Sequence, residues 1–309
     1  MALTYLDELR RNFRGELKIN EPLAVRTSVR AGGAADLFAR PVDPEDLRVL
    51  LASCAAAGLP VSVLGGGANT LVADDGVEGL VIKLPVFAAE SALDAGGGTF
   101  VLGAGAPIAK VAQLMKEHGL AGAEFLAGIP GTLGGAVAMN AGTKNGETVR
   151  VVDAVEVASA AEVRWVGRDQ LTWRYRACEL PAESVVTRVR IRLHRPDAAG
   201  LVASRAAMES DLAYRKSTQP LHLPNSGSVF TNPPGDHAGR LIEAAGLKGR
   251  RAGNAQISEQ HANWIVNHGG ARSSDVRALI ELARTEVAAR FGVTLVPEVK
   301  LLGRWSPPA

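Results

Sequence analysis

The sequence predicts an α+β fold, and three observations support this prediction. Segments typical of short β-strands alternate with helical segments along the chain. Of the 309 residues, 47% are hydrophobic but only 5% are aromatic, so an aliphatic core is expected. The 34 glycines gather in clusters rather than in a flexible linker, which favours ligand-binding loops over disorder.

The first half of the chain has clear helix starts and stops. Residues 1–19 predict a short amphipathic helix. Over 43–58 we expect Asp43 to cap a helix, Pro44 to occupy its first turn and Gly58 to end it. A further helix at 108–118 should end at Gly119. Strands are expected at 60–64, 80–84 and 99–103.

The second half opens with strands at 149–158, 162–166 and 185–194. In the last, apolar residues alternate with Arg188, Arg190 and Arg192, which predicts a solvated cationic face, with an anion site as the weaker alternative. Residues 196–200 are expected to form a linker. After it we expect a helix at 201–213, a basic loop at 214–220, a helix at 236–246, strands at 255–258 and 264–267, a helix at 274–291 and a strand at 294–302.

Two glycine-rich segments are the most informative part of the chain. One is 65–69 (GGGAN), after a predicted strand, and the other is 123–142 (AEFLAGIPGTLGGAVAMNAG). Pro130, the glycines and Asn140 argue against a membrane helix in the second segment. Neither segment has the spacing of a dinucleotide fingerprint or a Walker loop. Successive N–H groups in such loops bind anions, so two loops suggest a large diphosphate-bearing cofactor, with a tight core crossing as the alternative.

Charge and cysteine content narrow the class of function. The net charge of +2 does not favour a nucleic-acid partner. The two cysteines, Cys54 and Cys178, suggest neither a disulfide framework nor a metal site, and Cys54 is expected to be a buried apolar residue. The N-terminus has no apolar signal segment, which predicts a cytoplasmic protein without a membrane partner.

From about residue 20 to 303, the chain resembles the UDP-N-acetylenolpyruvoylglucosamine reductase family. The motifs that carry the resemblance are specific together, although each alone is weak: NEPL (20–23), RAGGAAD (30–36), VLGGGANTLVADDGVEGLVIKL (63–84), LAGIPGTLGGAVAMNAG (126–142), YRKSTQP (214–220), SGSVFTNP (226–233), AGRLIEAAGLKGRRAGNAQIS (238–258) and LVPEVKLLG (295–303).

The resemblance implies an FAD-binding α+β fold of the vanillyl-alcohol-oxidase (PCMH) type at 20–195, with two subdomains at about 20–85 and 86–195. A smaller α+β substrate-binding domain is implied at 201–303. The implied reaction uses NADPH and bound FAD to reduce the enolpyruvyl double bond of UDP-N-acetylglucosamine enolpyruvate to UDP-N-acetylmuramate, in peptidoglycan precursor synthesis. The implied partner is therefore a small UDP-sugar.

Three positions match the catalytic residues of the family. Ser228, the serine directly before Val229, matches the proton donor, and Glu298 and Arg176 match the groups that stabilise the substrate carboxylate. From the residues alone, a turn serine, an exposed strand carboxylate and a surface arginine remain the alternatives. Arg176 would share a face with Arg174 if both lie on a strand.

The implied cofactor-binding residues are Gly65, Gly66, Gly67, Asn69, Thr70, Gly128, Ile129, Pro130, Gly131, Thr132, Gly134, Gly135, Ala141 and Gly142. The implied UDP-sugar residues are Tyr214, Arg215, Gln219, Asn232 and His261, with Arg215 on the diphosphate. Asn69 and Asn232 remain alternative turn residues, His261 remains an alternative structural histidine, and no metal is implied.

The chain departs from the family pattern in two places. The connection after Arg176 is short, which indicates the shorter, second type of the enzyme without a tyrosine loop, and residues 143–146 differ from the family pattern near the flavin edge.

The rival hypotheses are a flavin oxidase of the same fold and a non-catalytic flavin- or nucleotide-binding module. The C-terminal motifs argue against the first, and the three catalytic matches argue against the second.

Overall fold

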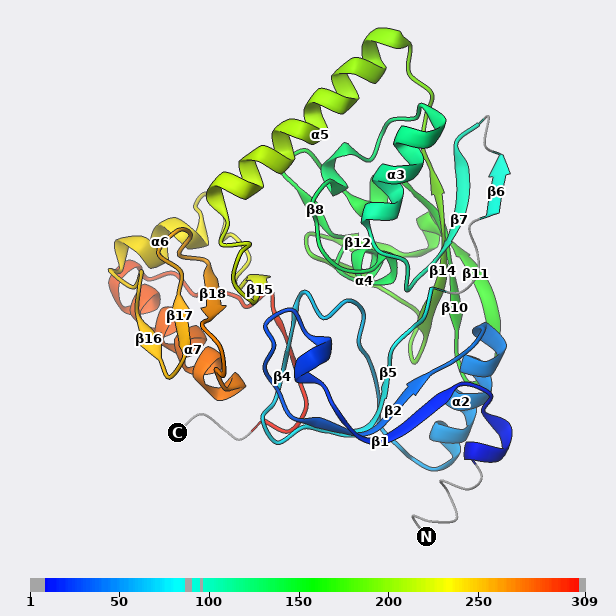
Figure 1. Ribbon diagram of the computed structural model, residues 1–309, viewed down its shortest axis with the longest axis horizontal. Coiled ribbons are helices and arrows are strands. Elements are labelled where there is room, and N and C mark those ends of the chain that lie inside the picture. Colours follow the sequence, from blue (N-terminus) through cyan, green and yellow to red (C-terminus); the bar gives the residue numbers. More distant parts are fainter. Residues whose placement is uncertain (1–8, 87–90, 95–96, 306–309) are drawn as a thin grey trace. The chain divides into compact units, whose positions relative to one another are not determined.

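The computed structural model describes residues 9–86, 91–94 and 97–305 and has the predicted α+β architecture (Figure 1). The chain forms two compact units. Unit 1 comprises Met1–Lys18, Leu37–Gly65 and Gly79–Ala213, and unit 2 comprises Ile19–Asp36, Gly66–Glu78 and Tyr214–Ala309. This division by contacts is discontinuous in sequence, whereas the domain boundaries drawn from the family resemblance are not, and those boundaries remain a prediction.

A four-stranded sheet has the order β1–β2–β5–β3, and its strands are β1 (Glu16–Pro22), β2 (Ala34–Arg40), β5 (Val77–Ile82) and β3 (Val61–Val63). The short helix Ala24–Arg26 follows β1. The predicted helix over 1–19 is therefore wrong at its end, because Glu16–Ile19 belong to β1. In ELKIN, Leu17 and Ile19 alternate with polar residues, which is a strand period. Residues 9–12 are helical, and residues 1–8 lie outside the described part of the chain.

Helix α2 (Pro44–Ala56) forms as predicted. The Asp43 side chain accepts a hydrogen bond from Asp46 N at 2.8 Å, Pro44 occupies the first turn, and Gly58 has a positive φ of 62°. Cys54 is fully buried, as expected, in a core with Leu47, Leu50, Leu80 and Ile82.

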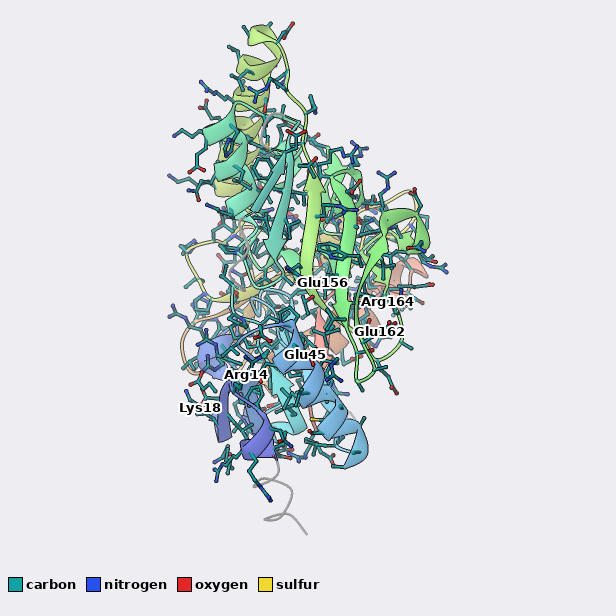
Figure 2. The ribbon with its side chains drawn as sticks, turned by 90° about the vertical axis from the view of Figure 1, so that its right-hand side faces the viewer. Arg14, Lys18, Glu45, Glu156, Glu162 and Arg164 are labelled. Atoms are coloured by element: carbon teal, nitrogen blue, oxygen red, sulfur yellow. The ribbon has the colours of Figure 1, made fainter. Side chains whose placement is uncertain are left out.

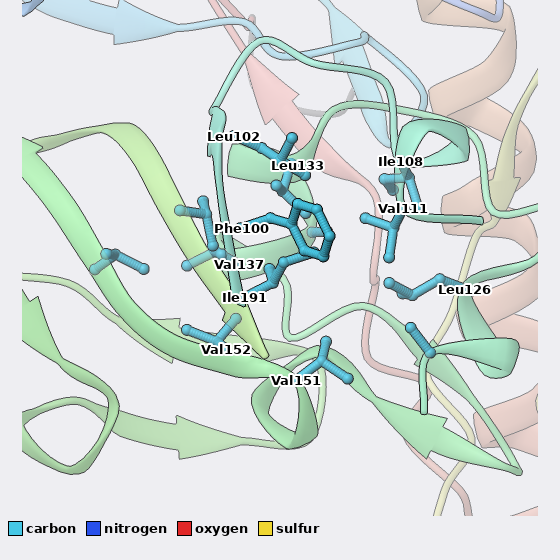
Figure 3. Close-up of a cluster of buried hydrophobic side chains, with 14 of the residues drawn as sticks. Phe100, Leu102, Ile108, Val111, Leu126, Leu133, Val137, Val151, Val152 and Ile191 are labelled. Carbon is cyan, nitrogen blue, oxygen red and sulfur yellow. The ribbon is translucent and has the colours of Figure 1, made fainter. Parts of the chain in front are cut away.

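A five-stranded antiparallel sheet forms the centre of unit 1, in the order β11–β10–β14–β7–β6. Its strands are β11 (Val163–Gly167), β10 (Val152–Ala158), β14 (Val185–Arg192), β7 (Thr99–Gly103) and β6 (Ser91–Asp94). Helices α3 (Ala109–His118) and α4 (Leu133–Ala138) supply apolar side chains to the same core, and Gly119 ends α3 as predicted. Figure 3 shows the Phe100 ring of β7 among Ile108, Val111, Leu133, Val137 and Ile191.

Short elements complete unit 1. They are the hairpins β8 (Gly142–Thr143) with β9 (Gly146–Glu147) and β12 (Thr172–Arg174) with β13 (Ala177–Glu179), and the 3₁₀ helices Glu124–Leu126, Thr148–Arg150 and Arg168–Gln170.

The predicted alternation along β14 is confirmed, but its cationic face is paired with carboxylates. Arg188 Nε donates to Glu156 Oε2 at 2.7 Å, and Arg190 Nε donates to Asp153 Oδ2 at 2.6 Å. Both carboxylates come from the neighbouring strand β10, where Glu156 lies directly opposite Arg188. Figure 2 shows Glu156 on this sheet, near Glu162 and Arg164 at β11. Carboxylates of the sheet therefore neutralise much of the expected positive charge.

Helix α5 (Ala198–Thr218) corrects three predictions at once. The predicted linker at 196–200 contains the helix start, where Asp197 Oδ1 accepts a hydrogen bond from Gly200 N at 2.7 Å. The predicted helix at 201–213 continues to Thr218, into the predicted loop at 214–220, and in its last turn Ser217 Oγ and Thr218 Oγ1 donate to the Tyr214 carbonyl oxygen at 2.9 and 2.7 Å. Arg215 and Lys216 are good helix formers, so propensity does not oppose this extension.

Unit 2 contains a second antiparallel sheet in the order β15–β18–β17–β16, with strands β15 (Asn225–Ser228), β18 (Trp264–Asn267), β17 (Ala255–Ile257) and β16 (Arg251–Ala252). Helices α6 (Ala238–Ala244) and α7 (Ser273–Phe291) confirm the predicted helices, and Gly292 ends α7. Asp74 caps α7 from far along the sequence, because its two carboxylate oxygens accept from Ser273 N and Ser274 N at 2.8 and 3.0 Å.

Strand β4 (Thr70–Val72) pairs in parallel with the last strand, β19 (Lys300–Leu302). The predicted strand at 294–302 is thus shorter than expected, because Pro297 has no N–H to continue a ladder. Leu295 and Val299 are buried as predicted, whereas Leu301 is 44% exposed and is not part of the expected apolar face. Among the helices that the structure describes, none is long and apolar enough to cross a membrane.

Replacing Asp43 by alanine should lower the free energy of unfolding by about 1 kcal/mol, because the first turn of α2 loses its cap. Urea unfolding followed by circular dichroism measures this change. Asp43→Asn is the matched control, since an amide oxygen still accepts from Asp46 N. Equal losses in the two variants would instead assign the effect to the exposed Arg14–Asp43 ion pair.

Candidate active site

The first glycine cluster begins in unit 1, directly after β3. Lys83 Nζ donates a hydrogen bond to the Gly65 carbonyl oxygen at 2.9 Å. A Cβ placed on Gly65 would lie 2.9 Å from Thr132 Oγ1, which is closer than real Cβ atoms approach. The Gly65 turn and the second glycine segment therefore lie against each other, and a larger residue at Gly65 would push them apart.

The second glycine segment is packed onto the strand end after β7. Gly134 N donates to the Ala104 carbonyl oxygen at 2.8 Å, and a Cβ on Gly134 would lie 2.8 Å from the Ala104 side chain. Thr132 begins α4 and its hydroxyl accepts from Gly135 N at 3.4 Å. This close approach of backbone to Ala104 is what the alternative of a tight core crossing predicts, and the approach of the segment to a ligand stays a prediction.

Asn140 connects the second glycine segment to the hairpin that carries Arg176. It is buried, with a positive φ of 40°, and its Nδ2 donates to the Arg174 carbonyl oxygen and to Glu147 Oε2, each at 3.1 Å. From the sequence, Asn140 was expected only to argue against a membrane helix. A lone amide in an apolar run was the signal for this role, because buried amides need partners.

Two of the predicted cofactor residues, Ala141 and Gly142, take part in local backbone structure. The Ala141 carbonyl oxygen accepts from Thr148 N and Thr148 Oγ1 at 2.9 and 2.7 Å, and Gly142 pairs with Glu147 in the β8–β9 hairpin. Their contact with a flavin remains a prediction.

Arg176 lies in the turn between β12 and β13, not on a strand, which corrects the expectation that it shares a face with Arg174. The pairing of Arg174 with Ala177 leaves Tyr175 and Arg176 as the turn residues. Arg176 has a positive φ of 58°, and its guanidinium lies 4.8 Å from the centroid of the Tyr175 ring. Because a non-glycine residue is strained there, the turn holds this arginine at a cost in free energy.

Ser228 ends β15 after a β-bulge. Asn225 pairs with Val266 and Ser228 with Trp264, so three steps on β15 oppose two on β18. Gly227, with φ of 78°, takes up the extra residue, and Asn225 Oδ1 accepts from Gly227 N at 2.9 Å. The bulge breaks the strand alternation. Ser226 is therefore 1% exposed and its hydroxyl has no hydrogen-bond partner, whereas Ser228 is only half-buried.

Glu298 is held beside the Ser228 strand by the main chain. Glu298 N donates to the Val229 carbonyl oxygen at 2.8 Å. Val229 and Phe230 are buried, and Asn263 fixes Phe230 through hydrogen bonds to both its N–H and its carbonyl oxygen, at 2.9 and 2.8 Å. Unit 2 thus brings together two of the three predicted catalytic residues, and Arg176 belongs to unit 1.

Asn225 and Asn263 were not singled out by the sequence. The Asn225–Gly227 spacing is a turn signal that could have revealed the bulge, whereas the clamp from Asn263 depends on strand pairing that no local pattern shows.

The predicted UDP-sugar residues are placed in different elements of unit 2. Tyr214, 59% exposed, and Arg215 lie in the last turns of α5. Gln219 follows directly, and its Oε1 is buried without a hydrogen-bond partner in the protein. Asn232 Oδ1 accepts from Ala238 N at 3.1 Å at the start of α6, which agrees with the alternative of a turn residue.

His261 lies in the loop between β17 and β18. Its ring Nδ1 accepts a hydrogen bond from Asn263 N at 3.2 Å, and its backbone N–H donates to Ser258 Oγ at 3.3 Å. Burial, reinforced by the positive charge of Lys248, holds the pKa of His261 below its usual value. The neutral imidazole therefore supports the loop that also carries Asn263.

The residues of the two glycine segments fit FAD. The two segments meet at Gly65 and Thr132 with little side-chain bulk between them, and glycine-rich backbone of this kind is what a diphosphate bound by N–H groups requires. In the described ranges 9–86, 91–94 and 97–305, no group of three or more His, Cys, Asp and Glu side chains is placed to hold a metal ion.

Two family models match the chain. The model described as "FAD binding domain" matches residues 35–165, and the model described as "UDP-N-acetylenolpyruvoylglucosamine reductase, C-terminal domain" matches residues 219–302. Both matches agree with the predicted fold class, an FAD-binding α+β part followed by a C-terminal part.

Relatives are similar over almost the whole chain. A UDP-N-acetylenolpyruvoylglucosamine reductase of Myxococcus xanthus is 58% identical over 290 residues, which is 93% of each chain. A second, from Anaeromyxobacter sp., is 52% identical over 98% of this chain and 91% of its own. The crystal structure of UDP-N-acetylenolpyruvylglucosamine reductase from Thermus caldophilus is 36% identical, with a TM-score of 0.78 over 94% of this chain and 99% of that one.

His261 should make the stability of the protein depend on pH. Because its pKa is lowered on folding, its contribution is fully present above the ordinary value near 6.5 and is lost as the pH falls through the lowered pKa. Thermal unfolding between pH 7.5 and 5 should therefore show a smaller loss in His261→Gln than in the unchanged protein. The exposed His222→Gln variant is the control, and an equally small loss there would contradict the assignment.

Proposed function

The chain belongs to the UDP-N-acetylenolpyruvoylglucosamine reductase family, and from this we propose that Ser228, Glu298 and Arg176 carry out the chemistry of that reaction. The protein reduces the enolpyruvyl double bond of UDP-N-acetylglucosamine enolpyruvate to give UDP-N-acetylmuramate, with bound FAD and with NADPH as the hydride source. The observation that carries the assignment is the hydrogen bond from Glu298 N to the Val229 carbonyl oxygen, which places Glu298 beside Ser228.

Bound FAD would supply the chemistry of hydride transfer between NADPH and the alkene. The residues that would hold it are the main chains of the two glycine segments, including the main chain of Asn69, with Thr70 and Thr132 as flanking polar side chains. The fit rests on the glycine-rich backbone of these segments, which meet at Gly65 and Thr132. Main-chain N–H groups suit the diphosphate of the cofactor.

Ser228 completes the reduction by supplying the proton. Hydride addition to one alkene carbon leaves a carbanion-like charge on the other, the carbon that bears the carboxylate. The Ser228 hydroxyl donates its proton to that carbon, so the alkene gains one hydride and one proton. A serine is a weak acid, and the step therefore needs groups that lower the energy of the charge before protonation.

Glu298 and Arg176 fill that requirement by binding the substrate carboxylate as it takes on enolate character. The guanidinium of Arg176 offers a planar pair of donors to two oxygens. Glu298 must be in its acid form to donate, because an ionised carboxylate only accepts hydrogen bonds. The strained turn fixes the position of Arg176, and the Val229 hydrogen bond fixes that of Glu298.

The UDP-sugar is proposed to bind through Tyr214, Arg215, Gln219, Asn232 and His261. Arg215 takes the diphosphate because of its charge, and the partnerless Oε1 of Gln219 takes a donor of the substrate. The FAD-binding and substrate-binding domains are proposed at 20–195 and 201–303. A cytoplasmic place in cell-wall precursor synthesis, with effects on cell shape and division, follows from this substrate and needs neither a nucleic acid nor a membrane.

Ser228→Ala should separate the two halves of the reaction. Under anaerobic conditions, bleaching of the flavin absorbance by NADPH should keep its rate. Recovery of the absorbance with UDP-N-acetylglucosamine enolpyruvate should slow by about 10²- to 10⁴-fold, because the proton donor is gone. Stopped-flow absorbance measures both steps.

The matched control for this prediction is Ser226→Ala, which removes a buried hydroxyl that has no partner and should leave both rates intact. Unchanged recovery in Ser228→Ala would refute the proton-donor role. Flavin that NADPH bleaches and that oxygen, but not the UDP-sugar, restores would favour the oxidase instead.

Arg176→Gly should lower kcat/KM by about 100-fold or more, because the carboxylate loses its guanidinium. The free energy of unfolding should be maintained or rise slightly, since glycine accepts the positive φ of this turn without strain. Steady-state kinetics and urea unfolding measure the two effects.

Glu183→Gly is the control for Arg176→Gly. Glu183 also has a positive φ, 52°, and is exposed in another turn, so this change should relieve strain without changing the kinetics. A loss of stability in Arg176→Gly equal to the loss of activity would mean that the arginine acts through folding.

A further inference from the structure

The segment Gly66–Asn69 of unit 2 contacts the Glu298 segment through a side chain. Asn69 Nδ2 donates a hydrogen bond to the Glu298 carbonyl oxygen at 3.1 Å. The next contact is between main chains, because Lys300 N donates to the Asn69 carbonyl oxygen at 3.0 Å. From there, Thr70–Val72 and Lys300–Leu302 continue as the parallel pair β4 and β19. Asn69 thus holds the main chain at Glu298, just before the β4–β19 pair begins at Thr70 and Lys300.

The same segment lies beside the bulge that precedes Ser228. A Cβ on Gly227 would lie 3.7 Å from the Ala68 carbonyl oxygen, which is ordinary van der Waals contact. Glu298 also contacts the strand of Ser228, because its N–H donates to the carbonyl oxygen of Val229, the residue after Ser228. Three segments of unit 2 therefore meet around the proposed proton-transfer residues: the end of the glycine cluster, the Ser228 bulge and the Glu298 segment.

Where these three segments meet, the hydrogen bonds between main chains do not involve a side chain. The bond from Asn69 to the Glu298 carbonyl oxygen, in contrast, depends on one side-chain amide. A neutral hydrogen bond contributes only about 1 kcal/mol to stability, so its loss should not unfold the protein. Its loss would instead free the Glu298 main chain at the point where the position of that residue is set. Misplacement of a catalytic group by about 1 Å costs as much as 10²-fold in rate.

We propose that Asn69 is a positioning residue for protonation of the substrate: its amide fixes Glu298 relative to Ser228, and this role is separate from holding FAD. The inference rests on the proposed function of these two residues. It also changes the expectation from sequence, in which Asn69 was a cofactor-binding residue.

The experiment uses the FAD-loaded protein and compares Asn69→Ala with Asn69→Asp, which keeps the size of the side chain but has no N–H to donate. In both variants, recovery of the flavin absorbance with UDP-N-acetylglucosamine enolpyruvate should slow by about 10- to 100-fold. The rate of flavin reduction by NADPH should be retained. The solvent deuterium isotope effect on recovery should rise, because proton transfer becomes the slow step.

Two further measurements do not depend on activity. The FAD dissociation constant, from titration of the FAD-free protein, should stay close to that of the unchanged protein. Thermal unfolding of the FAD-free protein should show a small loss of stability.

Asn267→Ala is the matched control. Asn267 is also an amide of unit 2 that donates to a distant carbonyl oxygen, that of Val29 at 2.8 Å. Its loss should reduce stability at least as much without slowing recovery of the flavin absorbance.

Three outcomes would overturn the proposal: weaker FAD binding with both half-reactions slowed together, no change in either half-reaction, or the same slowing in Asn267→Ala. Ser228→Ala measured in the same series separates the two levels of the argument. If Ser228→Ala slows recovery and the Asn69 variants do not, only the role of Asn69 fails. If Ser228→Ala also recovers at the normal rate, the proposed function itself fails.

Discussion

The hydrogen bond from Glu298 N to the Val229 carbonyl oxygen is the constraint on which the candidate site in unit 2 depends. Val229 and Phe230 are buried on one side of this bond, and two hydrogen bonds with the Asn263 side chain fix the main chain of Phe230. Asn69 and the β4–β19 ladder anchor the other side. A weakly acidic hydroxyl can serve as a proton donor only if its partners are held in place, and here the main chain, rather than flexible side chains, does most of that work.

Local signals in the sequence predicted the elements whose limits are set locally. The Asp43 cap, the Pro44 start and the glycines that end α2, α3 and α7 lie within the helices that they define or next to them. The extension of α5 through Tyr214–Thr218 and the strand at Glu16–Ile19 were not predicted. In the first case a polar segment that contains good helix formers continues the helix, and in the second the pairing with β2 outweighs a helical pattern.

The site was predictable in kind but not in arrangement. Glycine clusters indicated backbone laid against a ligand, and family motifs named Ser228, Glu298 and Arg176. No sequence pattern shows that Arg176 occupies a strained turn or that Asn69 bonds to Glu298, and the Asn225–Gly227 spacing signals a turn without showing the pairing that makes it a bulge. The Asn69 bond and the bulge depend on partners distant in the sequence, and the positive φ of Arg176 leaves no compositional trace at an arginine.

The cap that Asp74 gives to α7 has a consequence for how the protein can be divided. A fragment cut after α5 would retain most residues of unit 2, yet α7 would lack the carboxylate at its first turn, β19 would lack β4, and the core would lack Leu71. The C-terminal portion is therefore not a transferable module. Fusion, split-protein or domain-swap designs would have to carry the segments Ile19–Asp36 and Gly66–Glu78 with it, for example as separately expressed complementing peptides.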